Sequence, residues 1–372
     1  MRRLVYNVIS LFAFFLIAGC TRTLDEEPVP GGHAVMANLN VSVCLSGVSS
    51  SAARAFDDYT IAATDDEKMQ TLRIIVVRPD GTVEHNRFLD IEKAAEVYED
   101  ASFKVVANES KRIYLFANEG LTTIKNGLPE DVVLPRLPDF DFSALEKGDI
   151  FPSDDIAGLT IGLSGSSEEL AGPLPMSECH KIWMPAEDRS CRLFITRAAV
   201  KFSFMITNES GQPLTLSGLT VDKILRKEYY MPKNTRYTVD EDGIREITEY
   251  DVPSSGDNNG YYTFKRTYDD AVTLTSGAEK VLEPVYLLES KYLDPAGNTG
   301  QDGTRLNYSM SISLAEYGGT QQKNEYFTNL PQLPRNTHVV VHATIRGKGE
   351  INWVVDVEPY GEVILDPIFG LD

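Results

Sequence analysis

The 372-residue sequence has few of the features that mark an enzyme, a nucleotide site or a helical core. No stretch repeats apolar residues at helical spacing over about 15 residues, which argues against a helical bundle. No zinc-protease motif, nucleophile elbow, phosphate loop or dinucleotide fingerprint is present. Basic residues are in the minority, with 35 Lys and Arg against 55 Asp and Glu. The net charge of −20 argues against nucleic acid as a partner, because phosphates need a basic surface.

Cysteine is also scarce, at four residues. Cys20 follows Leu16-Ile17-Ala18-Gly19 at the end of an apolar run, and small residues before a cysteine resemble a bacterial lipobox. In such a signal the cysteine is lipidated and becomes the mature N-terminus. Cys179 and Cys191 are close enough in sequence to close a short disulfide loop in an oxidising envelope, or they could remain two free thiols.

No group of residues marks a catalytic, metal or cofactor site. Cys179 and His180 are adjacent, and neighbours in an extended strand point to opposite faces, so they are poorly placed to share a proton. Paired acids such as Asp154-Asp155 lack the spacing of a calcium loop and are typical of solvated loops. We therefore assign no catalytic residue, no metal and no cofactor, and expect that the chain is not an enzyme.

Residues 1–19 have the layout of a signal peptide, with Arg2 and Arg3, an apolar core at 11–17 and small residues before Cys20. A transmembrane helix needs about 20 apolar residues, so we interpret this run as a removed signal. Its removal takes two arginines and no acid, which leaves 33 basic and 55 acidic residues and a net charge of −22. Residues 20–36 are then a lipidated linker that carries the acidic run Asp25-Glu26-Glu27.

The segment 37–45 is the clearest strand in the chain. Its odd positions are all apolar and its even positions are mostly polar, which is the pattern of a half-buried strand. A run rich in Ser, Ala and Gly follows it and ends at Arg54 and Ala55, and exposed tips of small residues are where proteases cut readily. A lipid site, a strand and an arginine in this order favour a protein that is tethered first and released later. The alternative is that Arg54 is an ordinary loop arginine.

Short strands recur along the rest of the chain, separated by Gly and Pro turns. The sequence predicts them at 69–77, 82–89, 103–107, 112–117, 193–206, 214–221, 236–239, 261–267, 281–288, 305–314, 337–346 and 351–358. Short helices are expected near 91–99 and 142–147. We therefore predict an all-β fold with two antiparallel β-sandwich domains in tandem, at 37–190 and 191–372, and a few short helices.

The C-terminal segment 361–372 has a strand-like pattern of its own. Val363, Leu365, Phe369 and Leu371 recur at every second position, and Pro367 completes the series. Proline cannot donate a hydrogen bond to a sheet, so this strand should lie at an edge or swing free. It is either an ordinary last edge strand of its own domain or a strand that adds to the sheet edge of another chain.

Several motifs resemble those of one family. The C-terminal half carries Leu333-Pro334-Arg335-Asn336-Thr337-His338 before a Val-rich strand, then Trp353, Val357-Glu358-Pro359-Tyr360 and Leu365-Asp366-Pro367-Ile368-Phe369-Gly370-Leu371. The run Thr196-Arg197-Ala198-Ala199-Val200-Lys201-Phe202 stands where a second domain would begin. Together with Cys20 and the acidic run after it, these motifs resemble the Bacteroidetes fimbrillins, the lipoprotein pilins of type V fimbriae.

The resemblance implies transthyretin-like sandwiches and a route of assembly. Subunits of this family reach the cell surface as lipoproteins, and a trypsin-like protease cuts after an arginine near the N-terminus. The cut removes the lipid and the first strand, and a strand from a neighbouring subunit fills the groove. In this chain Cys20 would carry the lipid, Arg54 and Ala55 would flank the cut, and 361–372 would be the donor strand.

The expected function is therefore a structural subunit of a fimbria that serves adhesion at the outer membrane and cell surface. Its expected partners are other fimbrial subunits, the outer membrane through the lipid, and a processing protease. Two alternatives stay open: an anchor, tip or accessory subunit that keeps its lipid, and a surface glycan-binding lipoprotein with exposed aromatic residues.

Overall fold

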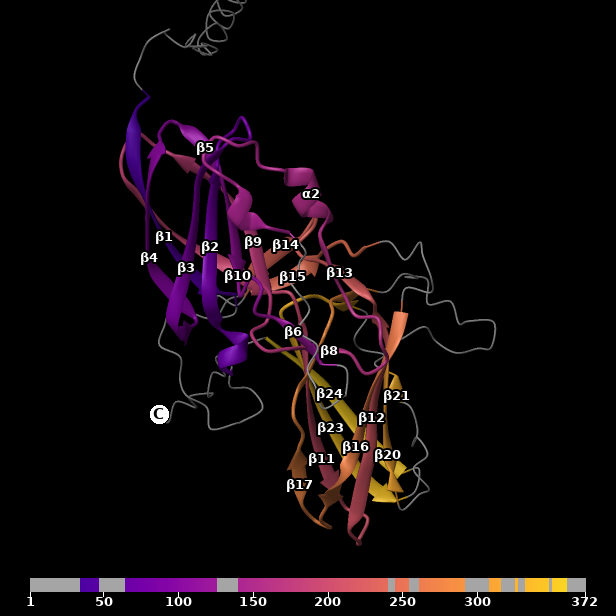
Figure 1. Cartoon of the computed structure of the whole chain (residues 1–372). Coiled ribbons are helices and arrows are strands. Elements are labelled where there is room, and N and C mark those ends of the chain that lie inside the picture. The colour runs from indigo at the N-terminus through magenta and orange to yellow at the C-terminus, as the bar shows by residue number, and fades with distance from the viewer. Residues whose placement is uncertain are drawn as a thin grey trace, which may run out of the picture. The chain divides into compact units, whose positions relative to one another are not determined.

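The computed structural model describes residues 34–46, 64–125, 140–239, 245–253, 261–291, 308–315, 325–326, 332–347 and 350–359. All of the secondary structure in these described residues lies in the compact unit Met36–Asp372. This part of the chain is nearly all β, as predicted, and most of its strands pair antiparallel (Figure 1).

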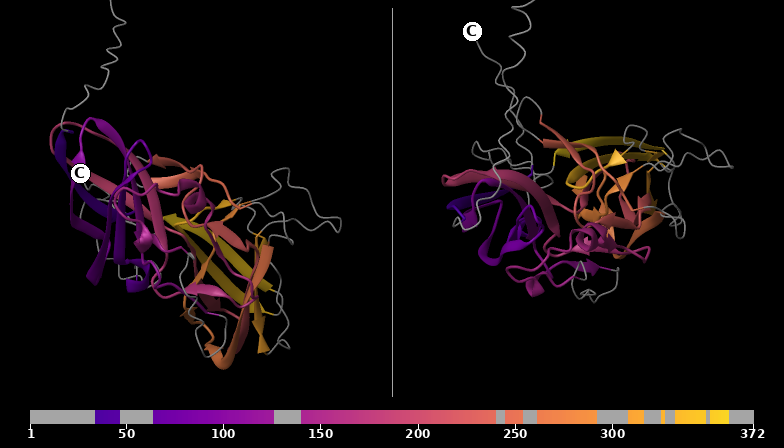
Figure 2. Two further views of the ribbon diagram at one scale, coloured as in Figure 1. Left: turned by 45° about the horizontal axis from the view of Figure 1, so that its top comes forward. Right: turned by 90° about the horizontal axis from the view of Figure 1, so that it is seen from above.

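A seven-stranded sheet forms the first half of the fold. Its spatial order is β3-β2-β5-β9-β10-β1-β4. The strands are β1 (Met36–Leu45), β2 (Met69–Val77), β3 (Val83–Ala95), β4 (Val97–Val106), β5 (Glu109–Ala117), β9 (Met176–Met184) and β10 (Arg189–Arg197). Figure 2 shows these indigo and magenta strands curving around a common interior. Apolar residues from all seven strands pack in that interior as one cluster.

Two further sheets form a sandwich in the second half. One has the order β24-β23-β11-β18-β8-β6, with β17 also paired to β11, and the other has the order β16-β12-β20-β21. The first contains β6 (Thr123–Lys125), β8 (Glu169–Ala171), β11 (Val200–Asn208), β17 (Glu279–Val281), β18 (Val285–Leu287), β23 (Thr337–Gly347) and β24 (Glu350–Pro359). The second contains β12 (Leu214–Leu225), β16 (Tyr261–Leu274), β20 (Ser309–Leu314) and β21 (Glu325–Tyr326). Their inward residues share one apolar core.

Short elements complete the described part of the fold. Three two-stranded ribbons pair β7 (Thr160–Gly162) with β13 (Lys227–Tyr229), β14 (Arg236–Val239) with β15 (Arg245–Glu249), and β19 (Ser290–Lys291) with β22 (Gln332–Leu333). The helical turns are η1 (Asp65–Glu67), η2 (Phe142–Ala144) and α2 (Ser153–Gly158). The short helix predicted near 142–147 is present only as the three-residue 3-10 turn η2, and the chain is extended again at Leu145.

The prediction of strands at 37–45 and 69–77 is confirmed, while the short helix expected near 91–99 is wrong. Residues 91–95 continue β3, and β4 begins at Val97. Met69 of β2 lies opposite Ala95, so pairing between strands holds this stretch extended. Tertiary pairing overrides the local preference of its Ala and Glu residues for a helix.

The single long strand predicted over 193–206 is also wrong. β10 ends at Arg197 and β11 begins at Val200, and the two belong to different sheets. Ala198 donates its backbone hydrogen bond to Pro175, and Ala199 accepts one from Asn336, so the chain bends at this alanine pair. The predicted domain boundary at 190 and 191 falls inside β10, and β6 and β8 from the first half extend the β18 sheet of the second. The division into 37–190 and 191–372 stays a prediction.

Candidate functional site

The N-terminal strand β1 lies inside the seven-stranded sheet. It pairs parallel with β10, where Val41 lies opposite Cys191, and antiparallel with β4, where Leu39 lies opposite Phe103. Although it is the first of the described strands, β1 therefore has a hydrogen-bonded neighbour on each side. Without β1, the sheet would present a groove between β4 and β10.

The inward face of β1 fills the core of this sheet. Ala37, Leu39, Val41, Val43 and Leu45 are all buried, whereas Asn38 and Asn40 between them are exposed. These five side chains belong to the same apolar cluster as residues from β4, β9 and β10. Burying the four larger ones is worth about 1.5–3 kcal/mol each, or on the order of 6–12 kcal/mol in gross terms. The period-two pattern read from the sequence thus identifies the side chains that hold β1 in place.

Polar contacts fix both ends of β1 in its register. At the first end, Asn38 donates from its backbone nitrogen and from Nδ2 to the two carboxylate oxygens of Asp188, at 2.8 and 2.9 Å. These hydrogen bonds hold the pKa of Asp188 below its ordinary value. At the second end, the backbone nitrogen of Leu45 donates to the carbonyl of Glu96 at 2.9 Å, and that of Ser46 donates to Ile195 at 2.8 Å.

The turn that precedes β23 contacts the chain just after β1. Asn336 has a φ of 60° and directs its side chain into a buried polar cluster. Its Nδ2 donates to the carbonyl of Ser46 at 3.4 Å, and its Oδ1 accepts from Nη1 of Arg197 at 3.1 Å. One asparagine thus links the end of β1, the end of β10 and the start of β23.

The charged residues around Arg197 form an extension of this cluster. Nε of Arg197 donates to the carbonyl of Glu67 at 2.7 Å, and Nζ of Lys201 lies 2.9 Å from the Glu67 carboxylate. The hydroxyl of Tyr286 donates to the same carboxylate at 2.6 Å. Burial raises the pKa of Glu67, but Lys201, Arg197 and Tyr286 outweigh it and hold the pKa below its ordinary value.

The motif around Arg335 has a structural role in this fold. Its guanidinium is buried, and it donates to the carbonyls of Tyr229 and Tyr230 and to the carboxylate of Glu289. Three residues later the imidazole of His338 contacts the hydroxyl of Ser203 at 2.8 Å. The Pro-Arg-Asn turn is therefore a buried polar anchor before β23, which leads through β24 toward the C-terminal segment.

Most of the residues predicted for lipidation, processing and assembly lie outside the residues that the structure describes. These are Cys20, Arg54, Ala55, Val363, Leu365, Phe369 and Leu371, together with the whole segment 361–372. The described chain ends at Pro359, the last residue of β24, which is the edge strand of its sheet.

The disulfide considered between Cys179 and Cys191 is not formed in the structure. Both are free thiols, as is Cys44. In the sheet, Cys179 lies opposite Tyr114 of β5 and Cys191 lies opposite Val41 of β1, so neither thiol is paired across strands with the other.

Other site types find no support in the described ranges. Those ranges contain no cluster of three or more His, Cys, Asp or Glu residues placed to hold a metal ion. They also hold no helix of the length and hydrophobicity needed to span a membrane. Sequence reasoning did identify β1, but it missed Asn38 with Asp188 and Ser46 with Asn336, because those partners are 150 and 290 residues apart.

The chain was compared with protein-family models, curated proteins and solved structures. The chain matches no protein-family model, and no curated protein is similar to it. Among solved structures, the C-terminally truncated tip fimbrial protein Mfa3 from Porphyromonas gingivalis matches with a TM-score of 0.52 and 10% identity, over 87% of this chain and 100% of that chain.

Two other solved structures with fimbrial names are similar at lower scores. A fimbrilin from Porphyromonas gingivalis has a TM-score of 0.45 and 13% identity over 90% of this chain and 99% of its own. A fimbrial assembly protein from Parabacteroides distasonis has a TM-score of 0.41 and 12% identity over 87% and 98%. The likeness to Mfa3 carries the conclusion: the chain has the fold of a Bacteroidetes fimbrial protein, as its sequence motifs predict.

Proposed function

We propose that this chain is a structural subunit of a cell-surface fimbria that assembles by exchange of a strand between subunits. The single observation that carries the proposal is the position of β1. It supplies five buried side chains to the core, and it is flanked by β10 and β4, both of which come later in the chain. A cut after β1 would leave it held only by non-covalent contacts.

The sequence supplies an arginine at a suitable place for that cut. Arg54 follows the last residue of β1 by nine positions, and every partner strand of β1 lies beyond it. Cleavage between Arg54 and Ala55 would separate β1, together with the lipid proposed on Cys20, from the rest of the subunit. The lipid would hold the uncut subunit at the outer membrane, and the cut would release it.

The C-terminal segment has the pattern needed to replace β1. Its alternating residues at 363, 365, 367, 369 and 371 match in number and spacing the five inward positions of β1 at 37, 39, 41, 43 and 45. Pro367 in the centre would remove one hydrogen bond from the new pairing. Ordering and association are expected to cost about 4–15 kcal/mol, which is comparable with the gross gain from burial. β1 and the C-terminal segment of a neighbouring subunit should therefore bind the groove between β4 and β10 with similar strength. Cleavage after Arg54 would favour the neighbour's segment, because β1 is then no longer covalently attached.

Sequencing the N-terminus of surface-released protein tests this proposal. A start at Ala55 is the expected result for a stalk subunit, and its loss in an Arg54→Ala variant would assign the cut. A matched variant, Arg87→Ala in the sheet, should leave processing unchanged. Released protein that still begins at Cys20 would contradict the proposed cleavage.

A tip, anchor or accessory role is the second candidate. Mfa3, a solved structure that matches with a TM-score of 0.52, is a tip fimbrial protein, which favours this alternative. A tip subunit needs to join the fibre at one end only, whereas a stalk subunit needs both a groove and a donor. Counting subunits per fibre by immunogold labelling separates the roles, since labels along the length indicate a stalk and a single terminal label indicates a tip.

A further inference from the structure

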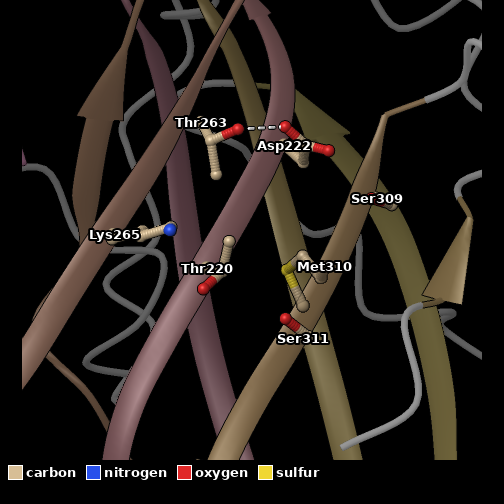
Figure 3. Close-up of a pocket in the computed structure, with 7 residues that line it drawn as sticks. All are labelled: Thr220, Asp222, Thr263, Lys265, Ser309, Met310 and Ser311. Carbon is tan, nitrogen blue, oxygen red and sulfur yellow. Dashed lines mark hydrogen bonds between the residues drawn. The ribbon is translucent and has the colours of Figure 1, made fainter. Parts of the chain in front are cut away.

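A polar hollow lies on the four-stranded sheet of the second sandwich. It has a volume of about 210 Å³. Its lining comes from three neighbouring strands: Thr220 and Asp222 of β12, Thr263 and Lys265 of β16, and Ser309, Met310 and Ser311 of β20 (Figure 3). The hollow is remote in sequence from β1, and the proposed assembly makes no use of it.

The register of the three strands arranges the polar side chains in two rows. Thr220 lies between Lys265 on one side and Ser311 on the other, and Asp222 lies opposite Ser309. The hydroxyl of Thr263 donates to Oδ1 of Asp222, as Figure 3 shows. The neighbouring residue Val221 is buried in the core, and because side chains alternate along a strand, Thr220 and Asp222 point to the other face.

Several polar groups of the hollow have hydrogen-bonding capacity left over. Ser309 and Ser311 are only 3% and 2% exposed, yet their hydroxyls make no hydrogen bond among the residues that the structure describes. Both residues line the hollow, so a ligand there can hydrogen-bond to their hydroxyls. Thr263 occupies one oxygen of Asp222, which leaves the other available.

The charges of the hollow add a donor and an acceptor. Lys265 is exposed and forms no ion pair within the described ranges, and Asp222 lies diagonally across from it on the next strand. An ammonium group only donates, a carboxylate only accepts, and the serine and threonine hydroxyls do both. One positive and one negative charge balance each other, so the hollow suits a ligand without net charge that carries several hydroxyl groups.

We propose that this hollow binds one neutral sugar residue. Hydroxyls of the sugar would donate to Asp222 and accept from Lys265, while Ser309 and Ser311 form the base of the site. The strongly acidic chain, with a net charge of −20, disfavours an anionic ligand. No aromatic side chain lines the hollow, so a single site should bind weakly, and repeated copies along the proposed fibre would supply avidity.

Saturation-transfer NMR on the full, uncut chain tests this site. The probes are methyl hexosides of glucose, galactose and mannose, with N-acetylglucosamine. At least one should receive saturation, and the signal should fall at least tenfold in Asp222→Ala and in Lys265→Met. Lys280→Met on β17, an exposed lysine of the other sheet, is the matched control and should bind as the unaltered chain does.

Lys265 is exposed, so the Lys265→Met variant should fold even if Asp222→Ala does not. No transfer from any neutral sugar, or equal transfer in Lys265→Met and in the unaltered chain, would overturn the site. Stronger transfer from acidic sugars or from free amino acids would overturn the ligand class. The uncut chain does not polymerise under the proposed function, so failure here leaves the strand exchange standing, and the reverse also holds.

Discussion

Asn336 and Ser46 meet through a hydrogen bond of 3.4 Å between the amide nitrogen of one and the carbonyl oxygen of the other, although 290 residues separate them. Ser46 follows directly on β1, and Asn336 precedes β23 by one residue. The same asparagine binds Arg197 at the end of β10, and its backbone nitrogen donates to Ala199 at 2.8 Å. The end of the strand proposed to leave therefore touches the base of the hairpin that leads to the segment proposed to replace it.

The side chain of Asn336 should contribute measurably to the stability of the uncut chain. We expect Asn336→Gly to lower the free energy of unfolding by about 1–3 kcal/mol, because Arg197 loses a buried acceptor. Asn336→Ala should lower it further, since alanine adds strain at a φ of 60°. Urea unfolding measures both values. A glycine variant as stable as the unaltered chain would show that the contact contributes nothing.

Truncation of the inward side chains of β1 should weaken its hold on the groove. Leu39→Ala removes a fully buried side chain and should lower the free energy of unfolding by about 2–5 kcal/mol. Asn40→Ala on the exposed face of the same strand is the matched control and should stay within about 0.5 kcal/mol of the unaltered chain. Equal effects from the two variants would contradict the assignment of the buried face.

The raised pKa of Glu178 on β9 predicts that the folded protein loses stability as the pH rises. Burial raises its pKa to about 7, although Tyr237 donates to it at 2.5 Å and Thr196 at 3.3 Å. The pKa in the folded state is thus above the ordinary value of 4.5, so folding is favoured while the group is protonated. The contribution of Glu178 should be complete below pH 4.5 and decline between pH 4.5 and about 7.

The variant Glu178→Gln isolates this contribution. The free energy of unfolding of the variant minus that of the unaltered chain should rise by roughly 3 kcal/mol from pH 4.5 to 7.5. Above pH 7.5 this difference should stay constant. Tyr237→Phe removes a hydrogen bond that favours the charged form, so it should extend the decline to higher pH. Urea unfolding across this range gives both curves, and a flat difference for Glu178→Gln would refute the assignment.

The free thiols give a redox prediction. Because Cys179 and Cys191 are unpaired, dithiothreitol should leave the unfolding midpoint unchanged, and Cys179→Ser should shift the stability by less than about 1 kcal/mol. Loss of a native disulfide would instead cost about 2–4 kcal/mol. Intact mass after alkylation without reductant counts the free thiols directly.

The sequence predicts the strands well where one face alone is buried. In β1 the odd residues are apolar and buried, so local alternation identified both the strand and its inward face. β2 was predicted with the bounds it has in the structure, since its run of Ile and Val is a strong strand signal.

The remaining features depend on contacts that no local pattern encodes. Nothing in the residues of β1 indicates that it pairs parallel with β10, which lies 150 residues later. The break between β10 and β11 has no Gly or Pro, and is fixed by Arg197 binding Glu67 and Asn336. The polar hollow depends likewise on the register of β16, β12 and β20, which only the folded sheet defines.

Size analysis of the purified chain before and after limited trypsin cleavage tests the central claim most directly. Strand exchange predicts that the uncut chain is a monomer, that the chain cut after Arg54 loses the fragment containing β1 and forms long polymers, and that a chain lacking residues 361–372 is cut but stays monomeric. Cut protein that retains the β1 fragment and never polymerises, or polymers that form equally well without residues 361–372, would contradict the account.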